Sequence, residues 1–201
     1  MPLRIGITGS IGCGKSTVTR WLAERPGVVV IDADHEARAV LARGTAEVEE
    51  VYRRFGEGLR GADGELDRAA LGRLVFDDPD SLHALESIVH PAVRPRILAA
   101  IEGAENGAAE AVIIEAIKLV EGGLADVCDE VWLVTCATDE QLQRLIGRGS
   151  DRADAIARIQ AQGDITERLR PAASRVIDTS GAAEATRRRV LDAYEAALAP
   201  Q

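Results

Sequence analysis

Short apolar runs alternate along the chain with longer segments in which apolar residues recur at helical spacing. The short runs predict five β-strands, at Leu3–Thr8, Val28–Asp32, Ala111–Glu115, Glu130–Thr135 and Arg175–Asp178. Three of these runs contain unbroken apolar blocks, which are typical of strands covered by helices on both faces. The alternation therefore predicts an α/β fold built on a parallel sheet.

The longer segments predict helices and two subregions within one domain of 201 residues. The interval 44–107 contains no convincing strand, so we expect a helical insertion there, between the second and third strands. A second interval, 148–170, is polar and rich in arginine. Helical periodicity covers Lys15–Glu24, His35–Ala42, Glu47–Phe55, Asp67–Val75, Ser81–His90, Arg94–Glu105, Asp139–Arg148, Arg152–Gln162 and Ala183–Leu198.

The clearest chemical signal follows the first predicted strand. The segment Gly9-Ser10-Ile11-Gly12-Cys13-Gly14-Lys15-Ser16 fits the phosphate-binding pattern G-x-x-x-x-G-K-[ST], with a strand before it and a helix after it. Glycines let successive backbone N–H groups turn inward around a polyphosphate, and the helix adds the positive end of its dipole. Lys15 can then reach the β- and γ-phosphates while the Ser16 hydroxyl binds Mg²⁺. The alternative is a glycine-rich turn that binds nothing, which the flanking elements disfavour.

Acidic residues follow the second and third predicted strands. Asp32 and Asp34 come at the end of the second, and Glu115 closes the third, where it resembles the acid that ends a Walker B strand. Because ligands bind beyond the carboxyl ends of parallel strands, we expect these acids and the glycine-rich segment at one edge of the sheet. Either aspartate could accept a proton from an attacking hydroxyl or orient Mg²⁺. Spacing alone leaves other roles open: Asp34 as the N-cap of a helix from His35, Asp32 in a surface turn, and Glu115 as a solvated strand end.

Composition narrows the functional classes. Hydrophobic residues make up 46% of the chain and charged residues 28%, and no apolar run approaches the ~20 residues of a membrane span. The net charge of −9 argues against a surface that coats nucleic acid. We see no signal peptide, and the three cysteines, Cys13, Cys128 and Cys136, lack metal-site spacing. We therefore expect a cytoplasmic protein with reduced thiols.

Collinear motifs over nearly the whole chain resemble those of the dephospho-CoA kinase family. Together they are more specific than the phosphate loop alone, which many families share. The dipeptide His90-Pro91, which matches the family's HP, is expected to end a helix of the insertion. The other motifs are residues 8–17, similar to TGGIGSGKST; Ile31-Asp32-Ala33-Asp34 with Ala37-Arg38, similar to IDAD-x-x-AR; Leu119-Val120-Glu121, similar to the end of PLLxE; residues 141–148 and 158–162, similar to the lid; and residues 176–181, similar to VIDNSG.

The resemblance implies a P-loop NTPase-type, doubly wound α/β fold with a mainly five-stranded parallel sheet, a CoA-side helical insertion at 44–107 and a helical lid at 148–170. It implies transfer of the γ-phosphate of ATP to the ribose 3′-hydroxyl of dephospho-CoA, the last step of coenzyme A biosynthesis, with Mg²⁺ as cofactor. Asp34 matches the family's base, and Lys15 and Arg144 are the other implied catalytic residues. The implied ATP-binding residues are Gly9, Ile11, Gly12, Cys13, Gly14, Lys15, Ser16, Thr17, Arg144, Arg148 and Thr179, with Ser16 also on the metal. The implied substrate-binding residues are Asp34, Arg38, His90 and Lys118.

Several positions depart from the family pattern, among them the PLLxE segment, which has no proline here, and residues 163–165, which follow the lid glutamine Gln162. Lys118 lies where the PLLxE segment has leucine, Thr179 replaces an asparagine, and Cys13 replaces a serine. The chain therefore also fits another P-loop small-molecule, nucleoside or nucleotide kinase, or a catalytically impaired nucleotide-binding homologue. A guanine-nucleotide switch would need N/T-K-x-D, which neither lysine provides. We expect ATP and dephospho-CoA as partners, no nucleic acid and no membrane, and a monomer or small homo-oligomer.

Overall fold

The computed structural model describes residues 1–76 and 78–199 and contains a five-stranded parallel sheet. The spatial order of the strands is β2-β3-β1-β4-β5, and every neighbouring pair is parallel. All five predicted strands and the predicted α/β class are confirmed. The strands are β1 (Leu3–Gly9), β2 (Val28–Asp32), β3 (Ala111–Glu115), β4 (Glu130–Thr135) and β5 (Arg175–Asp178).

The chain divides into two compact units. The first contains residues 1–32 and the chain from Ile101 onward, and it holds the whole sheet; the second is Ala33–Ala100. Among the described helices of either unit, none is long and apolar enough to cross a lipid bilayer. The first unit contains the helices α1 (Lys15–Ala23), α6 (Thr138–Gly147), α7 (Arg152–Gln162), α8 (Ile165–Leu169) and α9 (Ala183–Leu198), and the 3₁₀ turns Leu124–Val127 and Arg170–Ala172.

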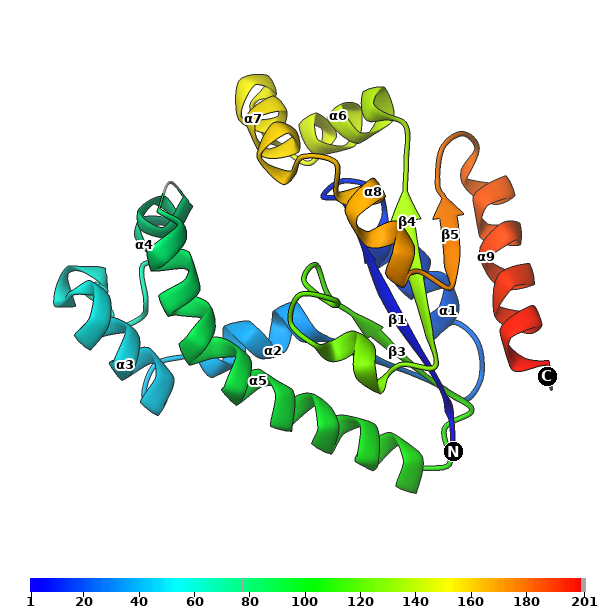
Figure 1. The fold of residues 1–201 in the computed structure, drawn as a ribbon, viewed down its shortest axis with the longest axis horizontal. Coiled ribbons are helices and arrows are strands. Elements are labelled where there is room, and N and C mark those ends of the chain that lie inside the picture. The colour runs from blue at the N-terminus through cyan, green and yellow to red at the C-terminus, as the bar shows by residue number, and fades with distance from the viewer. Residues whose placement is uncertain (77, 200–201) are drawn as a thin grey trace. The chain divides into compact units, whose positions relative to one another are not determined.

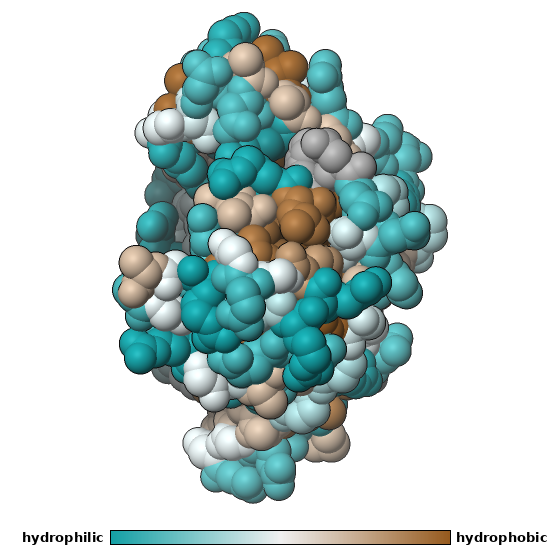
Figure 2. Space-filling model, turned by 90° about the vertical axis from the view of Figure 1, so that its left-hand side faces the viewer, coloured by the Kyte–Doolittle hydropathy of each residue, from teal (hydrophilic) through white to brown (hydrophobic). Residues whose placement is uncertain are grey.

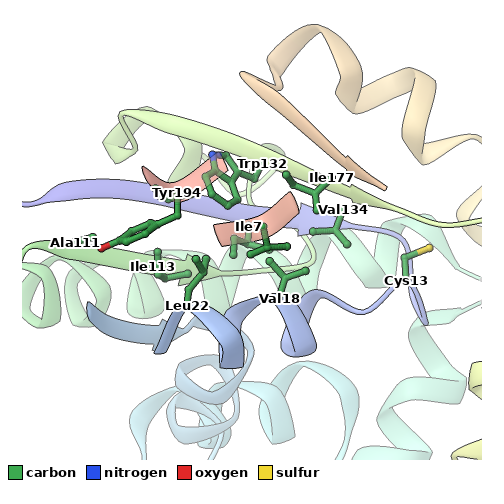
Figure 3. Packing of buried hydrophobic residues seen from close by; sticks show 12 residues of the cluster. Ile7, Cys13, Val18, Leu22, Ala111, Ile113, Trp132, Val134, Ile177 and Tyr194 are labelled. Carbon is green, nitrogen blue, oxygen red and sulfur yellow. The ribbon is translucent and has the colours of Figure 1, made fainter. Parts of the chain in front are cut away.

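Both faces of the sheet are covered within the first unit. Helices α1 and α9 pack against each other on one face, and the short helix α8 packs on β1 and β4 (Figure 1). Ile7 of β1 lies opposite Trp132 of β4, and both pack with Val18 of α1 and Tyr194 of α9 (Figure 3). Leu133 points to the other face and packs against α8. Because successive side chains of a strand alternate between faces, this double burial explains the unbroken apolar runs of β3 and β4, whereas Val29 and Val30 of the edge strand β2 are each 36% exposed.

The second unit is helical and has a core of its own. Among its described residues, no strand lies between β2 and β3. Thr45 caps one of its helices, because its hydroxyl accepts from the Val48 N–H at 3.2 Å. Val48, Val51 and Tyr52 pack with Leu71 in this core. Figure 2 shows a face of the molecule that is mostly hydrophilic, with hydrophobic side chains gathered near its middle. The elements are α2 (Ala33–Val40), α3 (Ala46–Phe55), a 3₁₀ turn (Glu57–Leu59), α4 (Arg68–Phe76) and α5 (Pro79–Asn106), which continues into the first unit.

Helix α5 corrects one prediction. The dipeptide His90-Pro91 was expected to end a helix, but α5 continues through both Pro91 and Pro95. Each proline lacks an N–H and leaves the carbonyl four residues earlier without its helical partner. The two prolines are exposed and four residues apart, so both gaps open on one solvated side of the helix, while Val93 and Ile97 are buried. Water can satisfy the freed carbonyls there, so the helix need not stop.

The cysteines correct a second prediction. Cys13 is joined to Cys136 by a disulfide, while Cys128 is a free thiol. The expectation of three reduced thiols is therefore wrong for this pair. Cys13 lies in the loop after β1 and Cys136 directly follows β4, and these two strands are neighbours in the sheet. A sequence separation of 123 residues hides a pairing that depends on strand order.

Candidate active site

Glycines give the loop after β1 its path. Gly9 has φ +139°, and a Cβ at this position would overlap the carbonyl oxygen of Val134 on β4. Gly14 has φ +89° and is the residue that precedes helix α1. Side chains are disfavoured at such angles, so glycine is needed at both positions. The sequence pattern thus folds as predicted, with the loop leading from a buried strand into the N-terminus of a helix.

Lys15 lies inside this loop. Its Nζ donates to the carbonyl oxygens of Gly9 at 2.8 Å and Ser10 at 3.0 Å, and the residue is only 8% exposed. The first turn of α1 contains no acidic side chain to offset the positive end of the helix dipole. An ammonium and a helix N-terminus therefore converge at the loop, which is the electrostatic arrangement that binds phosphate.

Ser16 and Glu115 meet beside the loop. The Ser16 hydroxyl donates to Glu115 Oε1 at 2.7 Å, and Glu115 is 9% exposed. The contact follows from the sheet, because Glu115 at the end of β3 pairs with Ile7 of β1. Glu115 is thus a buried partner of the phosphate loop and not a solvated strand end. The sequence left Glu115 between the acid of a Walker B strand and a solvated strand end, and it was not among the predicted site residues.

A second cluster lies on the other side of the loop and contains Arg144 and Thr179. The guanidinium of Arg144 donates to Thr179 Oγ1 at 2.8 Å, to the Thr179 carbonyl at 2.7 Å and to Glu140 at 2.7 Å. Thr179 is 6% exposed, and its Oγ1 is 2.7 Å from the carbonyl oxygen of Cys13, to which it can donate. Arg144 is therefore tied to the phosphate loop through one buried threonine.

A cavity of about 170 Å³ opens beside this cluster. It combines an aromatic ring, two guanidinium groups and the start of α1, so a planar heteroaromatic ring could stack there while a chain of phosphates follows the loop. Arg148, at the C-terminal end of α6, lies at its rim and is exposed. The lining residues are Gly14, Thr17, Trp21, Arg144, Arg148, Thr179, Gly181, Ala183 and Thr186.

The turn after β5 is held by hydrogen bonds that fix this wall of the cavity. The Ser180 N–H donates to Asp178 Oδ1 at 2.9 Å and holds the pKa of that carboxyl below its usual value. The Ser180 hydroxyl accepts from the Ala137 N–H at 2.9 Å, and the Gly181 N–H donates to Glu140 at 2.8 Å. The loops after β4 and β5 are thereby joined next to Arg144.

The segment with Lys118 is attached to the end of β1. The Thr8 hydroxyl donates to the Ile117 carbonyl at 3.0 Å, and Leu119 is fully buried. Gly6 of β1 permits this approach, since a Cβ there would lie 2.5 Å from Leu119 Cδ2. The segment that departs from the family pattern therefore packs beside the strand that leads into the phosphate loop.

Asp34, Arg38 and His90 belong to the second unit, whereas the phosphate-loop, Arg144, Arg148 and Thr179 positions belong to the first. Helix α2 begins at Ala33, so Asp34 lies in its first turn and is not the residue before the helix. The N-cap alternative for Asp34 is therefore not what the structure has. The Arg38 carbonyl accepts from Arg68 at 2.9 Å, and His90 lies within α5.

Two glutamines that the sequence did not assign to the site contact the phosphate loop. Gln141 of α6 donates through Nε2 to the Ile11 carbonyl at 2.7 Å, and Gln162 accepts from the Ile11 N–H at 2.9 Å. Gln141 is only 7% exposed. Both stand in the lid-like motifs, but their contacts with a residue more than a hundred positions away give no local sequence signal.

The fold and the loop together define a class. The first strand of a parallel sheet leads into a phosphate loop that contains a lysine, and a carboxylate accepts a hydrogen bond from the serine of that loop. This is the architecture of a P-loop kinase. Comparison with known proteins narrows this class, because the dephospho-CoA kinase family model matches residues 3–184. The chain belongs to the dephospho-CoA kinase family.

Individual relatives agree with this assignment. The chain is 45% identical over 194 residues to the dephospho-CoA kinase of Symbiobacterium thermophilum, an alignment that covers 96% of this chain and 80% of the relative. Its structure is similar to that of TT1252 from Thermus thermophilus, with a TM-score of 0.83, 38% identity and coverage of 99% of both chains. It is also similar to dephospho-CoA kinase from Campylobacter jejuni, with a TM-score of 0.70, 26% identity and coverage of 97% and 96%.

Proposed function

We propose that this protein transfers the γ-phosphate of ATP to the ribose 3′-hydroxyl of dephospho-CoA, giving coenzyme A and ADP in the last step of coenzyme A biosynthesis. The observation that carries the proposal is the intact phosphate loop, with the Lys15 ammonium inside it and the Ser16–Glu115 pair beside it, in a chain of this family. Phosphoryl transfer depends mainly on positioning and charge stabilisation, which these groups supply.

The nucleotide is proposed to bind along the loop and the adjoining cavity. The backbone N–H groups and Lys15 hold the phosphates, and the adenine enters the cavity beside Trp21. In this assignment Arg144 and Arg148 lie near the nucleotide, where they neutralise negative charge. The proposed ATP-binding residues remain Gly9, Ile11, Gly12, Cys13, Gly14, Lys15, Ser16, Thr17, Arg144, Arg148 and Thr179.

Asp34 is proposed as the general base. It follows Asp32, the last residue of β2, which pairs with Glu115 at the carboxyl edge of the sheet. The Asp34 carboxylate takes the proton of the 3′-hydroxyl, the hydroxyl oxygen bonds to the γ-phosphorus, and the bond from that phosphorus to the β,γ-bridging oxygen breaks to release ADP. Arg38, His90 and Lys118 are proposed to bind dephospho-CoA, and the helical region 44–107 to form the acceptor side.

Magnesium fits the oxygen groups beside the loop. The Ser16 hydroxyl and Glu115 carboxylate are hard oxygen donors of the kind Mg²⁺ prefers. Within the described residues, no group of three or more His, Cys, Asp or Glu side chains could hold a metal alone. This matches an ion that is bound jointly by protein and nucleotide phosphates. When bound, Mg²⁺ would neutralise phosphate charge, with Ser16 and Glu115 holding it.

The proposal is tested by the choice of acceptor. Purified protein is incubated with ATP and Mg²⁺ and with dephospho-CoA, shikimate or a nucleoside, and the products are separated by chromatography and identified by mass. We expect ADP and coenzyme A in equal amounts with dephospho-CoA, and no phosphorylated product from the other acceptors. Phosphorylation of another acceptor in preference to dephospho-CoA would contradict the assignment.

A further inference from the structure

The peptide groups of Ile11 are held from both sides by side-chain amides. Its N–H donates to Gln162 Oε1 at 2.9 Å, and its carbonyl accepts from Gln141 Nε2 at 2.7 Å. Ile11 is the third residue of the phosphate loop, so the two bonds fix the peptide groups on both sides of its Cα, in the part of the protein that must fit the phosphates. The two glutamines come from different helices, α6 and α7, and both contacts lie within the first unit.

The two helices are anchored to different degrees. Gln141 is buried at 7% exposure, so its contact with the loop is part of the core. Helix α7 has one buried residue, Ala155, and ends at Gln162, where Gly163 turns the chain with φ +57°. The following helix α8 is fixed to the sheet, because Ile165 and Leu169 pack on Leu133. Gln162 therefore stands where an exposed helix joins an anchored one.

The chemistry of the Gln162 amide suits a coupling role. A glutamine oxygen accepts the Ile11 N–H without placing a negative charge beside the phosphate loop, which a carboxylate would do. The hydrogen bond from the Ile11 N–H fixes the orientation of the Gln162 side chain, with its amide oxygen toward Ile11. A shift of α7 would therefore either carry the Ile11 peptide with it or break this hydrogen bond.

We propose that Gln162 is a positioning residue for phosphoryl transfer, which couples α7 to the phosphate loop through the Ile11 N–H. This inference rests on the proposed function, since it assigns α7 to the lid of the same site. Gln162 acts through Ile11: it holds the loop in the form that receives the nucleotide, and it transmits the position of α7 to the phosphates.

The test compares two substitutions of Gln162 with a matched control on the same helix. Gln162→Met keeps the unbranched shape and removes the acceptor, Gln162→Glu keeps an acceptor and adds charge, and Gln160→Met alters an exposed residue two positions earlier. Steady-state kinetics give kcat and the KM for ATP at saturating dephospho-CoA. Hydrogen exchange of the Ile11 amide is measured without nucleotide, and the Tm is recorded for every variant.

We expect Gln162→Met to lower kcat about tenfold and to speed exchange at Ile11 about tenfold, as the loss of one hydrogen bond predicts. Gln162→Glu should keep Ile11 protected but raise the KM for ATP, because its carboxylate repels the triphosphate. Gln160→Met should match the wild type in every measurement.

Wild-type kcat or unchanged Ile11 exchange in Gln162→Met would overturn the proposal, as would an equal loss of kcat in Gln160→Met. If the Tm shows that Gln162→Met does not fold, an unchanged KM for ATP in Gln162→Glu would overturn it instead. Failure of the wild type to phosphorylate dephospho-CoA would refute the proposed function separately, because exchange at Ile11 needs no acceptor.

Discussion

Lys15 is the residue on which phosphate binding should depend most. Its ammonium is already held by the Gly9 and Ser10 carbonyls inside the loop, so it is in place before the nucleotide arrives. We expect Lys15→Ala to lower kcat/KM by about 10²–10³, as the loss of a preorganised electrostatic contact does. Arg20→Ala, which removes an exposed cation from the same helix, is the control and should retain full activity. Assays of ADP release with dephospho-CoA compare the two, and equal activity in both variants would refute the role of Lys15.

Asp34 offers a second test at this scale. Asp34→Asn removes the proposed proton acceptor with little change in shape, so kcat should fall by about 10²–10⁴ while ATP binding is unchanged. Asp32→Asn, two residues earlier, tests whether the effect is specific to the proposed base and should retain most of the activity. Turnover and calorimetric ATP titration measure both quantities. A larger loss of kcat in Asp32→Asn would move the base to that residue.

The residues differ in how well the sequence could reveal them. The glycines, Lys15 and Ser16 were predictable because one short segment contains both the turn residues and the phosphate contacts. Gln141 and Gln162 were not, because each becomes a loop contact only when the sheet brings α6 or α7 to Ile11. Cys13 was seen within the loop, but its bond to Cys136 depends on β1 and β4 being neighbours.

Among the helices and strands, hydrophobic periodicity predicted the strands and most helices. The prolines, which usually end a helix, led to one wrong helix boundary. All five apolar runs are strands, and the constraint is strongest in β1, β3 and β4, which are buried over most of their length, whereas the edge strands β2 and β5 are largely exposed. The prolines of α5 suggested a break, yet they lie on its solvated side and the helix continues. The short helix α8 was missed, because five residues give too little periodicity to identify it.

Helix α7 should change its mobility when nucleotide binds. We propose that the region 148–170 acts as a lid, and α7 within it has only one buried residue. Closure over ATP would exclude water that competes with the acceptor, so amide exchange in this region should slow in the presence of a non-hydrolysable ATP analogue. Strand β3, buried along its whole length, serves as an internal reference. Equal exchange of 148–170 with and without the analogue would argue against closure.

Glu130 and Arg175 join β4 to β5 and predict a pH effect. Arg175 donates to both carboxylate oxygens of Glu130, at 2.6 and 2.8 Å. This contact, helped by the indole N–H of Trp132, lowers the pKa of Glu130 below its ordinary 4.5, and burial of the carboxylate opposes the shift. A carboxyl whose pKa is lowered by folding stabilises the protein fully at pH values above 4.5, its pKa in the unfolded chain. This stabilisation is lost as the pH falls through the lower pKa of the folded state.

We therefore expect Glu130→Gln to reduce the free energy of unfolding by about 1.5–3 kcal/mol at neutral pH, the value of hydrogen bonds to a charged group. The difference from wild type should shrink in acid, where Glu130 becomes protonated. Urea unfolding at several pH values measures it. Glu57→Gln, at an exposed ion pair with Arg60, should have little effect, and a difference for Glu130→Gln that persists in acid would contradict the assignment.

At the scale of the whole molecule, the chain separates a sheet unit from a helical unit that is inserted between β2 and β3. The second unit has its own core, around Val48, Val51 and Tyr52. The sequence indicated this insertion through the absence of strand patterns between 44 and 107. The observed unit begins at Ala33, because α2 follows β2 immediately. Its assignment to the acceptor side remains a proposal.

The disulfide between Cys13 and Cys136 closes a covalent ring that contains the entire second unit, since the bonded residues are 123 positions apart. A ring of this size restricts the unfolded chain, and the chain-entropy model gives an upper value of about 5 kcal/mol for the stabilisation. Reduction, or the substitution Cys136→Ser, should therefore lower the Tm by up to about 10–20 °C for a chain of this length. Cys128→Ser is the matched control, because Cys128 is not bonded to another cysteine and burial raises its pKa to about 12, so it stays a thiol.

Alkylation of the unfolded protein and its intact mass count the thiols: one in the oxidised protein and three after reduction. If three thiols are found before reduction, or if the oxidised and reduced forms melt together, the ring does not contribute to the stability of the protein in solution.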